Sequence, residues 1–202
     1  MEKSMAKKKN SNTVKGLIRI GIFSALWVVV SFLLGCTIGF LPPVLIVLPC
    51  ILGLVGGIIY MAMFSKLEIK GGIVISSVLL GLCLFTMAPY GMMCFCTIAG
   101  GIIGEILMAV IGKDKFWAKA IGSSMALLGL AVGEYLPFIC MKEAYTALYA
   151  NNSFGTGPIL DQVMNVVTVP IMIVLLVATV IFTFVGCWVG EKIVQKHFNA
   201  DR

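Results

Sequence analysis

The sequence predicts an all-α integral membrane protein with six transmembrane helices and both chain ends on the inner side of the membrane. Hydrophobic residues make up 60% of the 202 positions and charged residues only 12%, against about 45–50% and about 25% in soluble domains. Six apolar runs are long enough to cross a hydrocarbon core of about 30 Å. Basic residues gather in alternate connections between these runs.

The expected spans follow one another along a single membrane domain, 1–202. They cover 17–35, 44–64, 71–88, 92–112, 118–139 and 166–190. Strands of a membrane barrel would alternate in hydrophobicity over about ten residues, and these runs do not. We therefore expect a basic leader at 1–16, a six-span bundle at 17–190 and a short cytoplasmic tail at 191–202.

The direction of the spans follows from the basic residues, because Lys and Arg are retained in cytoplasmic connections. With the N-terminus inside, 14 of the 15 basic residues fall on the inner side and only Lys142 falls outside. A missed or added span would place later clusters on the wrong side. The net charge of +6 therefore indicates a cell-membrane protein with an inner basic surface next to lipid, and not a partner of nucleic acid.

The outer connections differ from the inner ones in length and residue composition. They comprise 37–43, the tight turn 89–91 and a long segment at 140–165 that carries several tyrosines and asparagines. Long connections without strong periodicity are often functional lids. Aromatic residues also gather at membrane–water interfaces, so a solvated interfacial loop and a ligand-covering lid both stay open for 140–165.

Small residues spaced by four recur in the spans. Such pairs let helix backbones approach closely in lipid, so internal packing is the expected role of most of them. The pairs are Gly35/Gly39, Gly53/Gly57, Gly100/Gly104, Gly129/Gly133, Gly186/Gly190 and Gly21/Ala25.

Two carboxylates, Glu105 and Glu134, lie within the expected spans. A charge near the bilayer centre costs about 2.5–3.5 kcal/mol, so such residues face a cavity or a partner. At 1.5 Å per residue, Glu105 lies about 10 Å from the inner boundary and Glu134 about 7–8 Å from the outer one. We interpret Glu105 as an interior polar clasp with a hydroxyl or backbone partner and a weak approach from Lys113. Glu134 can reach an outward-facing pocket.

Signatures of catalysis are absent from the sequence. It contains no nucleotide-binding loop and no H-E-x-x-H or G-x-S-x-G motif. The seven cysteines have no zinc or C-x-x-C spacing, and His197 falls in the tail. We expect no metal, no cofactor and no catalytic residue, so binding or transport is favoured over an enzyme.

Three stretches resemble a known family. They are GLIRIGIFSALWVVVSFLLG after the basic leader, GGIIYMAMFSKLEIKGG at the end of the second span, and GGIIGEILMAVIGKDK. Together with the layout of nearly the whole chain, they are similar to the Trep_Strep (MptD-like) family of energy-coupling-factor (ECF) transporter S components.

The resemblance implies a six-helix membrane protein that captures a vitamin-like micronutrient or other small molecule from outside. Delivery would require a separate transmembrane coupling subunit and two ATPase subunits, which form an ABC importer with it. Family members contact the coupling subunit through Ala-x-x-x-Ala on the first helix, and Gly21-x-x-x-Ala25 stands at that position here. The substitution of Gly for Ala keeps that surface small.

The expected substrate site lies beneath the outer connections, around Pro42, Tyr90 and 145–152. Its candidate residues, placed near the rim, are Glu134, Tyr135, Tyr90, Tyr145 and Asn165. A carboxylate there suits a cationic or hydrogen-bond-donating ligand, and tyrosines suit a flat ring. Two alternatives stay open. A self-sufficient secondary transporter would show internal repeats, and a membrane redox protein or enzyme would use Cys94 and Cys96.

Overall fold

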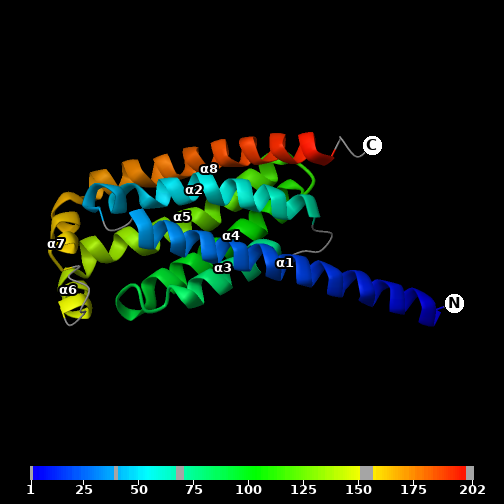
Figure 1. Ribbon diagram of the computed structural model, residues 1–202, viewed down its shortest axis with the longest axis horizontal. Helices are drawn as coiled ribbons and strands as arrows, with labels where there is room; N and C mark the ends of the chain where they lie inside the picture. The colour runs from blue at the N-terminus through cyan, green and yellow to red at the C-terminus, as the bar shows by residue number, and fades with distance from the viewer. Residues whose placement is uncertain (1, 39–40, 67–70, 151–156, 199–202) are drawn as a thin grey trace.

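A computed structural model describes residues 2–38, 41–66, 71–150 and 157–198, and these residues form helices and turns without strands (Figure 1). The elements are α1 (Glu2–Ile38), α2 (Pro42–Lys66), α3 (Gly72–Cys83), η1 (Pro89–Gly91), α4 (Met92–Ile111), α5 (Phe116–Cys140), α6 (Lys142–Ala150), α7 (Gly157–Val166) and α8 (Val169–Phe198).

Five stretches of the described helices are long and apolar enough to cross a membrane. They are Val14–Thr37, Val44–Lys66, Pro89–Ile111, Phe116–Cys140 and Val169–Lys196. The expected third span, 71–88, contains only the 12 residues of α3, about 18 Å of helix. After α3 the backbone forms tighter turns, with Phe85 N–H bonded to the Leu82 carbonyl and Met87 N–H to the Leu84 carbonyl. Pro89 then favours extended backbone at Ala88 (φ −135°, ψ 152°).

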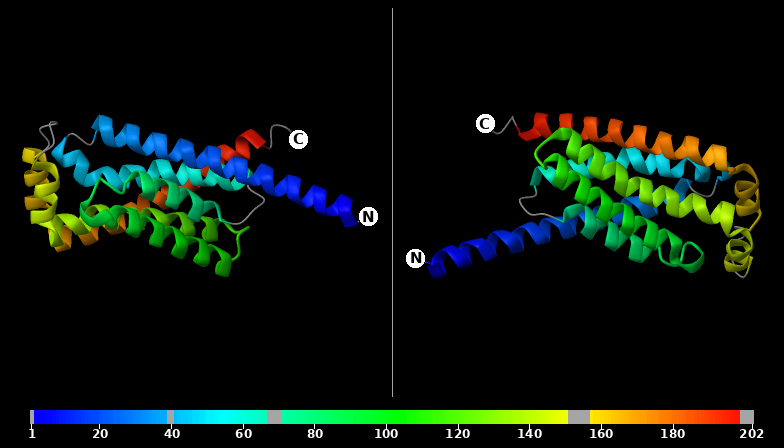
Figure 2. Two further views of the ribbon diagram at one scale, coloured as in Figure 1. Left: turned by 90° about the horizontal axis from the view of Figure 1, so that it is seen from below. Right: turned by 180° about the vertical axis from the view of Figure 1, so that it is seen from behind.

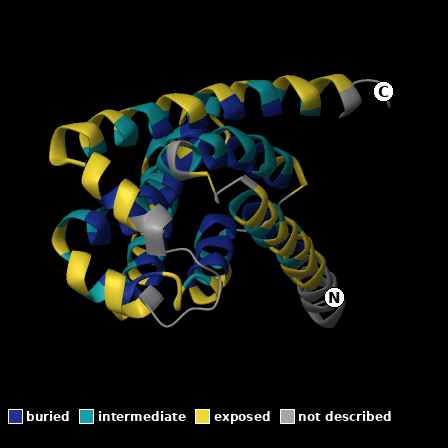
Figure 3. Ribbon diagram, turned by 60° about the vertical axis from the view of Figure 1, so that its left-hand side comes forward, coloured by how far each residue is buried: buried dark blue, intermediate teal, exposed yellow. Residues whose placement is uncertain are grey.

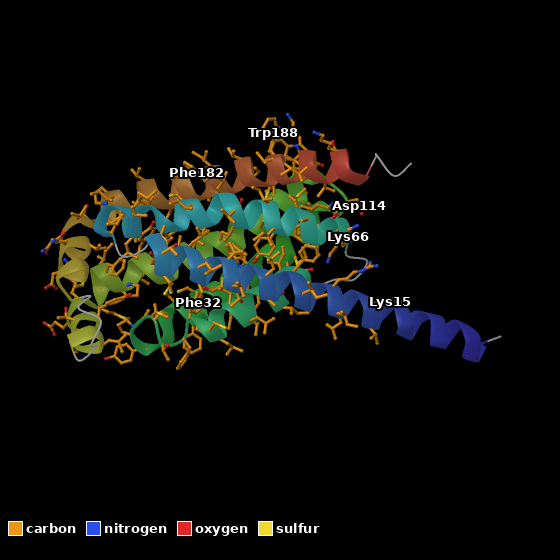
Figure 4. All side chains as sticks on the ribbon, viewed as in Figure 1. Lys15, Phe32, Lys66, Asp114, Phe182 and Trp188 are labelled. Atoms are coloured by element: carbon orange, nitrogen blue, oxygen red, sulfur yellow. The ribbon has the colours of Figure 1, made fainter. Side chains whose placement is uncertain are left out.

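The six apolar helices run back and forth along the long axis of the molecule (Figure 1). Helix α1 begins and α8 ends at one end of the bundle, which we call the basic end, while α6 and α7 lie across the opposite end (Figures 1 and 2). Lys15, Lys66 and Asp114 all lie toward the basic end (Figure 4). The short α3 pairs with α4 in an antiparallel hairpin.

Glycines allow close backbone approach in the two most extensively packed helix pairs, α4 with α5 and α2 with α8. A Cβ added at Gly100 would lie 2.8 Å from Gly129 Cα on α5, and one at Gly57 would lie 2.8 Å from Cys187 N on α8. No side chain fits in such gaps, so the pairs at 53/57, 100/104, 129/133 and 186/190 pack internally, as their spacing predicts. Gly21 and Gly35 on α1 differ, because nothing lies within 4 Å of an added Cβ there.

Burial divides the bundle into a packed interior and an apolar exterior (Figure 3). Trp27, Tyr135 and Phe138 are the largest side chains buried almost completely. Large apolar side chains such as Val110, Val174 and Ile181 point outward instead. An exterior this apolar suits lipid contact, as expected of a membrane bundle.

Two expected boundaries change in the structure. The expected leader and tail are helical where they are described, since α1 already begins at Glu2 and α8 continues to Phe198. The outer segment 140–165 is not a long irregular loop, because its described parts form α6 and most of α7. Helix α7 turns Val163 and Met164 inward, which fixes it against the bundle.

Candidate functional site

The α6–α7 end of the bundle contains a buried carboxylate. Helix α5 turns one face into the bundle, with Leu127, Leu130, Glu134 and Phe138 all buried along it at the spacing of a helical stripe. Glu134 is only 5% exposed, and its Oε1 has no hydrogen-bond partner among the described residues. A buried carboxylate oxygen without a donor is costly, so this position calls for a donor from elsewhere.

The neighbouring Tyr135 is also buried, but its hydroxyl is already used. Its OH donates a hydrogen bond of 2.7 Å to the Ile46 carbonyl on α2. That carbonyl lies in the turn before Pro49, where a proline disturbs the helical hydrogen bonds. Tyr135 therefore joins α5 to α2 beside Glu134.

Helix α8 reaches the same region by contacting Cys50 of α2. Cys50 Sγ lies 3.5 Å from Thr179 Oγ1 and 3.7 Å from the Leu175 carbonyl, both on α8, and it lies near Glu134. Sequence reasoning missed Cys50 and Thr179. Two signals were available in the sequence: the hydroxyl of Thr179 within the last apolar run, and Pro49 beside Cys50 within the second. Each residue type is unusual in a helix that only faces lipid.

Tyr145 of α6 closes this end of the bundle. It is 5% exposed, its ring centroid lies 5.0 Å from that of Phe138, and its hydroxyl donates to the Met87 carbonyl at 3.1 Å. Phe138 is one turn beyond Glu134 on α5. Tyr145 therefore fixes α6 onto both α5 and the turn between α3 and α4, directly over the part of α5 that contains Glu134.

The remaining candidate residues lie at the surface. Tyr90 is 77% exposed, with a left-handed backbone (φ 54°, ψ 20°), and Asn165 on α7 is exposed. The structure therefore brings Glu134, Tyr135 and Tyr145 together and leaves Tyr90 and Asn165 outside that group. Glu134 and Tyr135 are buried instead of lining a rim. Of the proposed lid residues 145–152, 151 and 152 fall outside the described part of the chain.

The polar groups of this region come from four helices. Its polar atoms are a carboxylate, two phenols, a thiol and a hydroxyl, contributed by α2, α5, α6 and α8. Within the described residues, no group of three His, Cys, Asp or Glu side chains is placed to hold a metal ion. The unpartnered carboxylate oxygen would accept a hydrogen bond from a cationic or N–H-bearing group.

Glu105 lies nearer the basic end and has three partners. Its Oε1 accepts hydrogen bonds from Lys113 Nζ at 2.7 Å and from Gly71 N–H at 2.9 Å, and its Oε2 accepts one from Ile73 N–H at 3.3 Å. The backbone partner agrees with the expected clasp, but the contact with Lys113 is a close ion pair, not a weak approach. The carboxylate caps the start of α3, where unpaired N–H groups attract negative charge.

A second contact lies at the α2 end of the α2–α3 connection. Arg19 of α1 donates a hydrogen bond of 2.9 Å to the Lys66 carbonyl at the end of α2. Residues 67–70 between the two anchor points lie outside the described part of the chain. The Arg19 bond links the middle of α1, two residues before Gly21, to the end of α2.

Gly21 and Ala25 lie on an open face of α1. Ala25 is exposed and Gly21 half-buried, and the large side chains around them point outward, with Ile18, Ile22 and Val29 each more than half exposed. Small residues at the centre of such a face leave room for a neighbouring helix to approach closely.

The comparisons with known proteins agree with this architecture. Residues 14–200 match the family described as hypothetical bacterial integral membrane protein (Trep_Strep). Among curated proteins and solved structures, none matches the chain. With a family match over almost its whole length and five candidate spans, the chain belongs to the Trep_Strep family of bacterial multi-pass integral membrane proteins.

Proposed function

We propose that the protein is the substrate-binding S component of an ECF-type ABC importer. Helix α3 and the turn after it would serve as the third of six passes, with both chain ends in the cytoplasm. Two observations support this orientation. The start of α1 and the end of α8 lie at the same end of the bundle (Figure 1), and the basic connections lie there too, whereas Lys142 begins α6 at the opposite end. The chain has no nucleotide-binding loop, so ATP hydrolysis would belong to partner subunits.

The observation that carries the proposal is Glu134 Oε1, a buried carboxylate oxygen without a described partner beneath the outer helices. The substrate would be a small micronutrient with a cationic or N–H-donating group directed at Glu134. Tyr135 and Phe138 would offer aromatic surface to a flat ring. Exclusion of water by α6 and α7 would strengthen the hydrogen bond to the carboxylate.

Delivery would follow by contact with the coupling subunit. The open face of α1 around Gly21 and Ala25 would receive a helix of that subunit, and reorientation of the bundle would expose the bound molecule to the cytoplasm. The link from Arg19 to Lys66 would carry movement of α1 into α2. The ATPases would supply the energy from the inner side.

Native mass spectrometry of the protein, gently solubilised from its own host, tests this function. A retained small molecule together with a coupling subunit and ATPases is the expected result. A retained molecule without those subunits, in a preparation where a known S component keeps its own, would favour a solitary secondary transporter. Absence of both, with thiol-dependent activity at Cys94 or Cys96, would favour the membrane redox alternative.

A further inference from the structure

Nine serine and threonine side chains are buried in the described part of the bundle, and they divide into two groups. Six donate to a backbone carbonyl three or four residues earlier, the usual solution for a hydroxyl in an apolar helix. These six are Ser31, Ser76, Thr97, Ser123, Thr179 and Thr183. The other three are Ser24, Ser77 and Ser124. The Ser77 hydroxyl has the Tyr60 phenol beside it, so Ser24 and Ser124 are the two left without any hydrogen-bond partner among the described residues.

These three serines lie on α1, α3 and α5, and these helices meet α2 around Trp27 and Tyr60. Trp27 is 1% exposed, and its Nε1 also lacks a described partner. Ser24 precedes it by one helical turn on the buried face of α1. In an apolar interior, each unpaired polar group costs about as much as a lost hydrogen bond. Ser24, Ser124 and the Trp27 indole are three such groups on helices that meet here, which points to a common partner.

Contacts among four helices define this region. The rings of Trp27 and Tyr60 lie 6.1 Å apart, and Tyr60 is hydrogen-bonded to Ser76 at 3.1 Å, which places α3 and its Ser77 beside α2. Trp27 and Leu127 of α5 both pack against Gly56, and Ser124 is one turn before Leu127. We call Ser24, Trp27, Tyr60, Ser76, Ser77 and Ser124 the polar junction.

The polar junction is separate from the Glu134 region. Ser124 and Glu134 occupy the same buried side of α5, about 15 Å apart by helical rise. Leu127 and Leu130 lie between them and are both buried. A molecule bound at one position would therefore not contact the other.

We propose that the polar junction is a binding site for a small neutral guest with an accepting oxygen and hydroxyl-type donors. The indole N–H is a donor only, so the guest must accept a hydrogen bond, while the serine hydroxyls both donate and accept. The guest is neutral because the junction offers no charged side chain to compensate an ion. Ordered water and a neutral oxygen-bearing solute share this chemistry, and the proposal does not depend on the transport function.

The sign of a stability change tests the proposal. If a guest bonds the unpartnered hydroxyls, Ser124→Ala lowers the Tm of the detergent-solubilised protein at least as much as Ser123→Ala. Ser123 is the matched control, because it lies on the same helix and its hydroxyl is satisfied by the Lys119 carbonyl at 2.8 Å. If no guest is bound, removing an unsatisfied buried hydroxyl leaves Tm unchanged or raises it, and the proposal fails.

Proton NMR of the Trp27 indole identifies the guest's source. The protein would carry ¹⁵N-tryptophan in perdeuterated detergent, with Trp27 assigned by Trp27→Phe and the exposed Trp117 and Trp188 as references for solvent contact. Cross-relaxation from water protons to the Trp27 N–H supports bound water. Absence of that water signal, with an added mass in native mass spectrometry, supports a solute. A Tm loss without either signal overturns the proposal, since the hydroxyls would then bond within the protein.

Discussion

Glu105 Oε1 and Lys113 Nζ lie 2.7 Å apart, and the same carboxylate receives Gly71 N–H from the start of α3. The Glu105 side chain on α4 therefore contacts two other segments. Through Lys113 it is linked to the connection after α4, and through Gly71 to the start of α3, 34 residues earlier. The pair is partly accessible, at 27% for Lys113 and 14% for Glu105. The carboxylate in an apolar run is thus compensated locally, by a cation and by the exposed N–H groups of a helix start.

Replacement of Glu105 separates these two roles. Glu105→Gln keeps one accepting oxygen, for Gly71 N–H. It loses the longer bond from Ile73 N–H and the partly exposed ion pair, which contributes about 0–1 kcal/mol, so the loss of stability should be small and ligand binding should stay close to normal. Glu105→Ala leaves two backbone N–H groups without an acceptor and should cost about 1–3 kcal/mol. Thermal unfolding in one detergent measures both. Equal losses for Gln and Ala would contradict the capping role.

The glycines predict opposite effects of the same substitution at two positions. Gly100→Ala places a Cβ 2.6 Å from the Met125 carbonyl oxygen and should destabilise the α4–α5 pair by about 1–3 kcal/mol. Gly21→Ala meets nothing within 4 Å, so Tm should hold or rise, because alanine is favoured over glycine in a helix by about 0.5–1 kcal/mol. A loss of Tm in the Gly21 variant would show that α1 packs differently.

Hydropathy and charge predicted the membrane class and, apart from the third span, the long apolar helices, because crossing lipid requires long apolar runs. They overestimated the third span. The run 71–88 is apolar throughout, and only Pro89 signals that its last residues leave the helix. Glycine spacing predicted close packing on α2, α4, α5 and α8, since that spacing has few other uses in lipid.

The site was harder to predict because it depends on helix rotation. Position along the chain gave the depth of Glu134, but not that its Oε1 would be buried without a donor. Tyr90 and Tyr145 look alike in sequence, yet Tyr90 is exposed and Tyr145 is buried where α6 packs on α5 and the turn after α3. One partner of Glu105 is the backbone N–H of Gly71 at the start of α3, 34 residues earlier. No local sequence pattern reveals that contact.

Glu134→Gln tests the proposed ligand contact. The change keeps the size of the side chain and removes its charge. A hydrogen bond to a charged group contributes about 1.5–3 kcal/mol, so affinity for a retained ligand should fall by about 10- to 150-fold. Isothermal titration measures it. Glu143→Gln is the control, because Glu143 is an exposed carboxylate on α6 and its loss should leave affinity unchanged. Equal affinities for both variants would remove Glu134 from the site.

Tyr145→Phe tests whether α6 acts as a cover. The variant loses the hydrogen bond to the Met87 carbonyl while its ring still packs on Phe138. Looser attachment of α6 should raise the ligand's dissociation rate several-fold with a smaller change in Tm. Tyr90→Phe removes the hydroxyl of an exposed tyrosine from the same end of the bundle and should change neither quantity. Stopped-flow dissociation compares the two, and identical rates would argue against a covering role.

Ala25→Trp tests the α1 face as the docking surface of the coupling subunit. A bulky ring at an exposed position with open space around it should leave folding and ligand binding intact, yet it would block the close approach of another helix and abolish ATP-dependent uptake. Val177→Trp is the matched control, because Val177 is an exposed apolar residue on α8, outside the proposed interface. Uptake into proteoliposomes with the coupling and ATPase subunits separates the variants. Since the ring clashes only if a helix packs against Gly21 and Ala25, normal uptake with Ala25→Trp would place the partner on another face of the bundle.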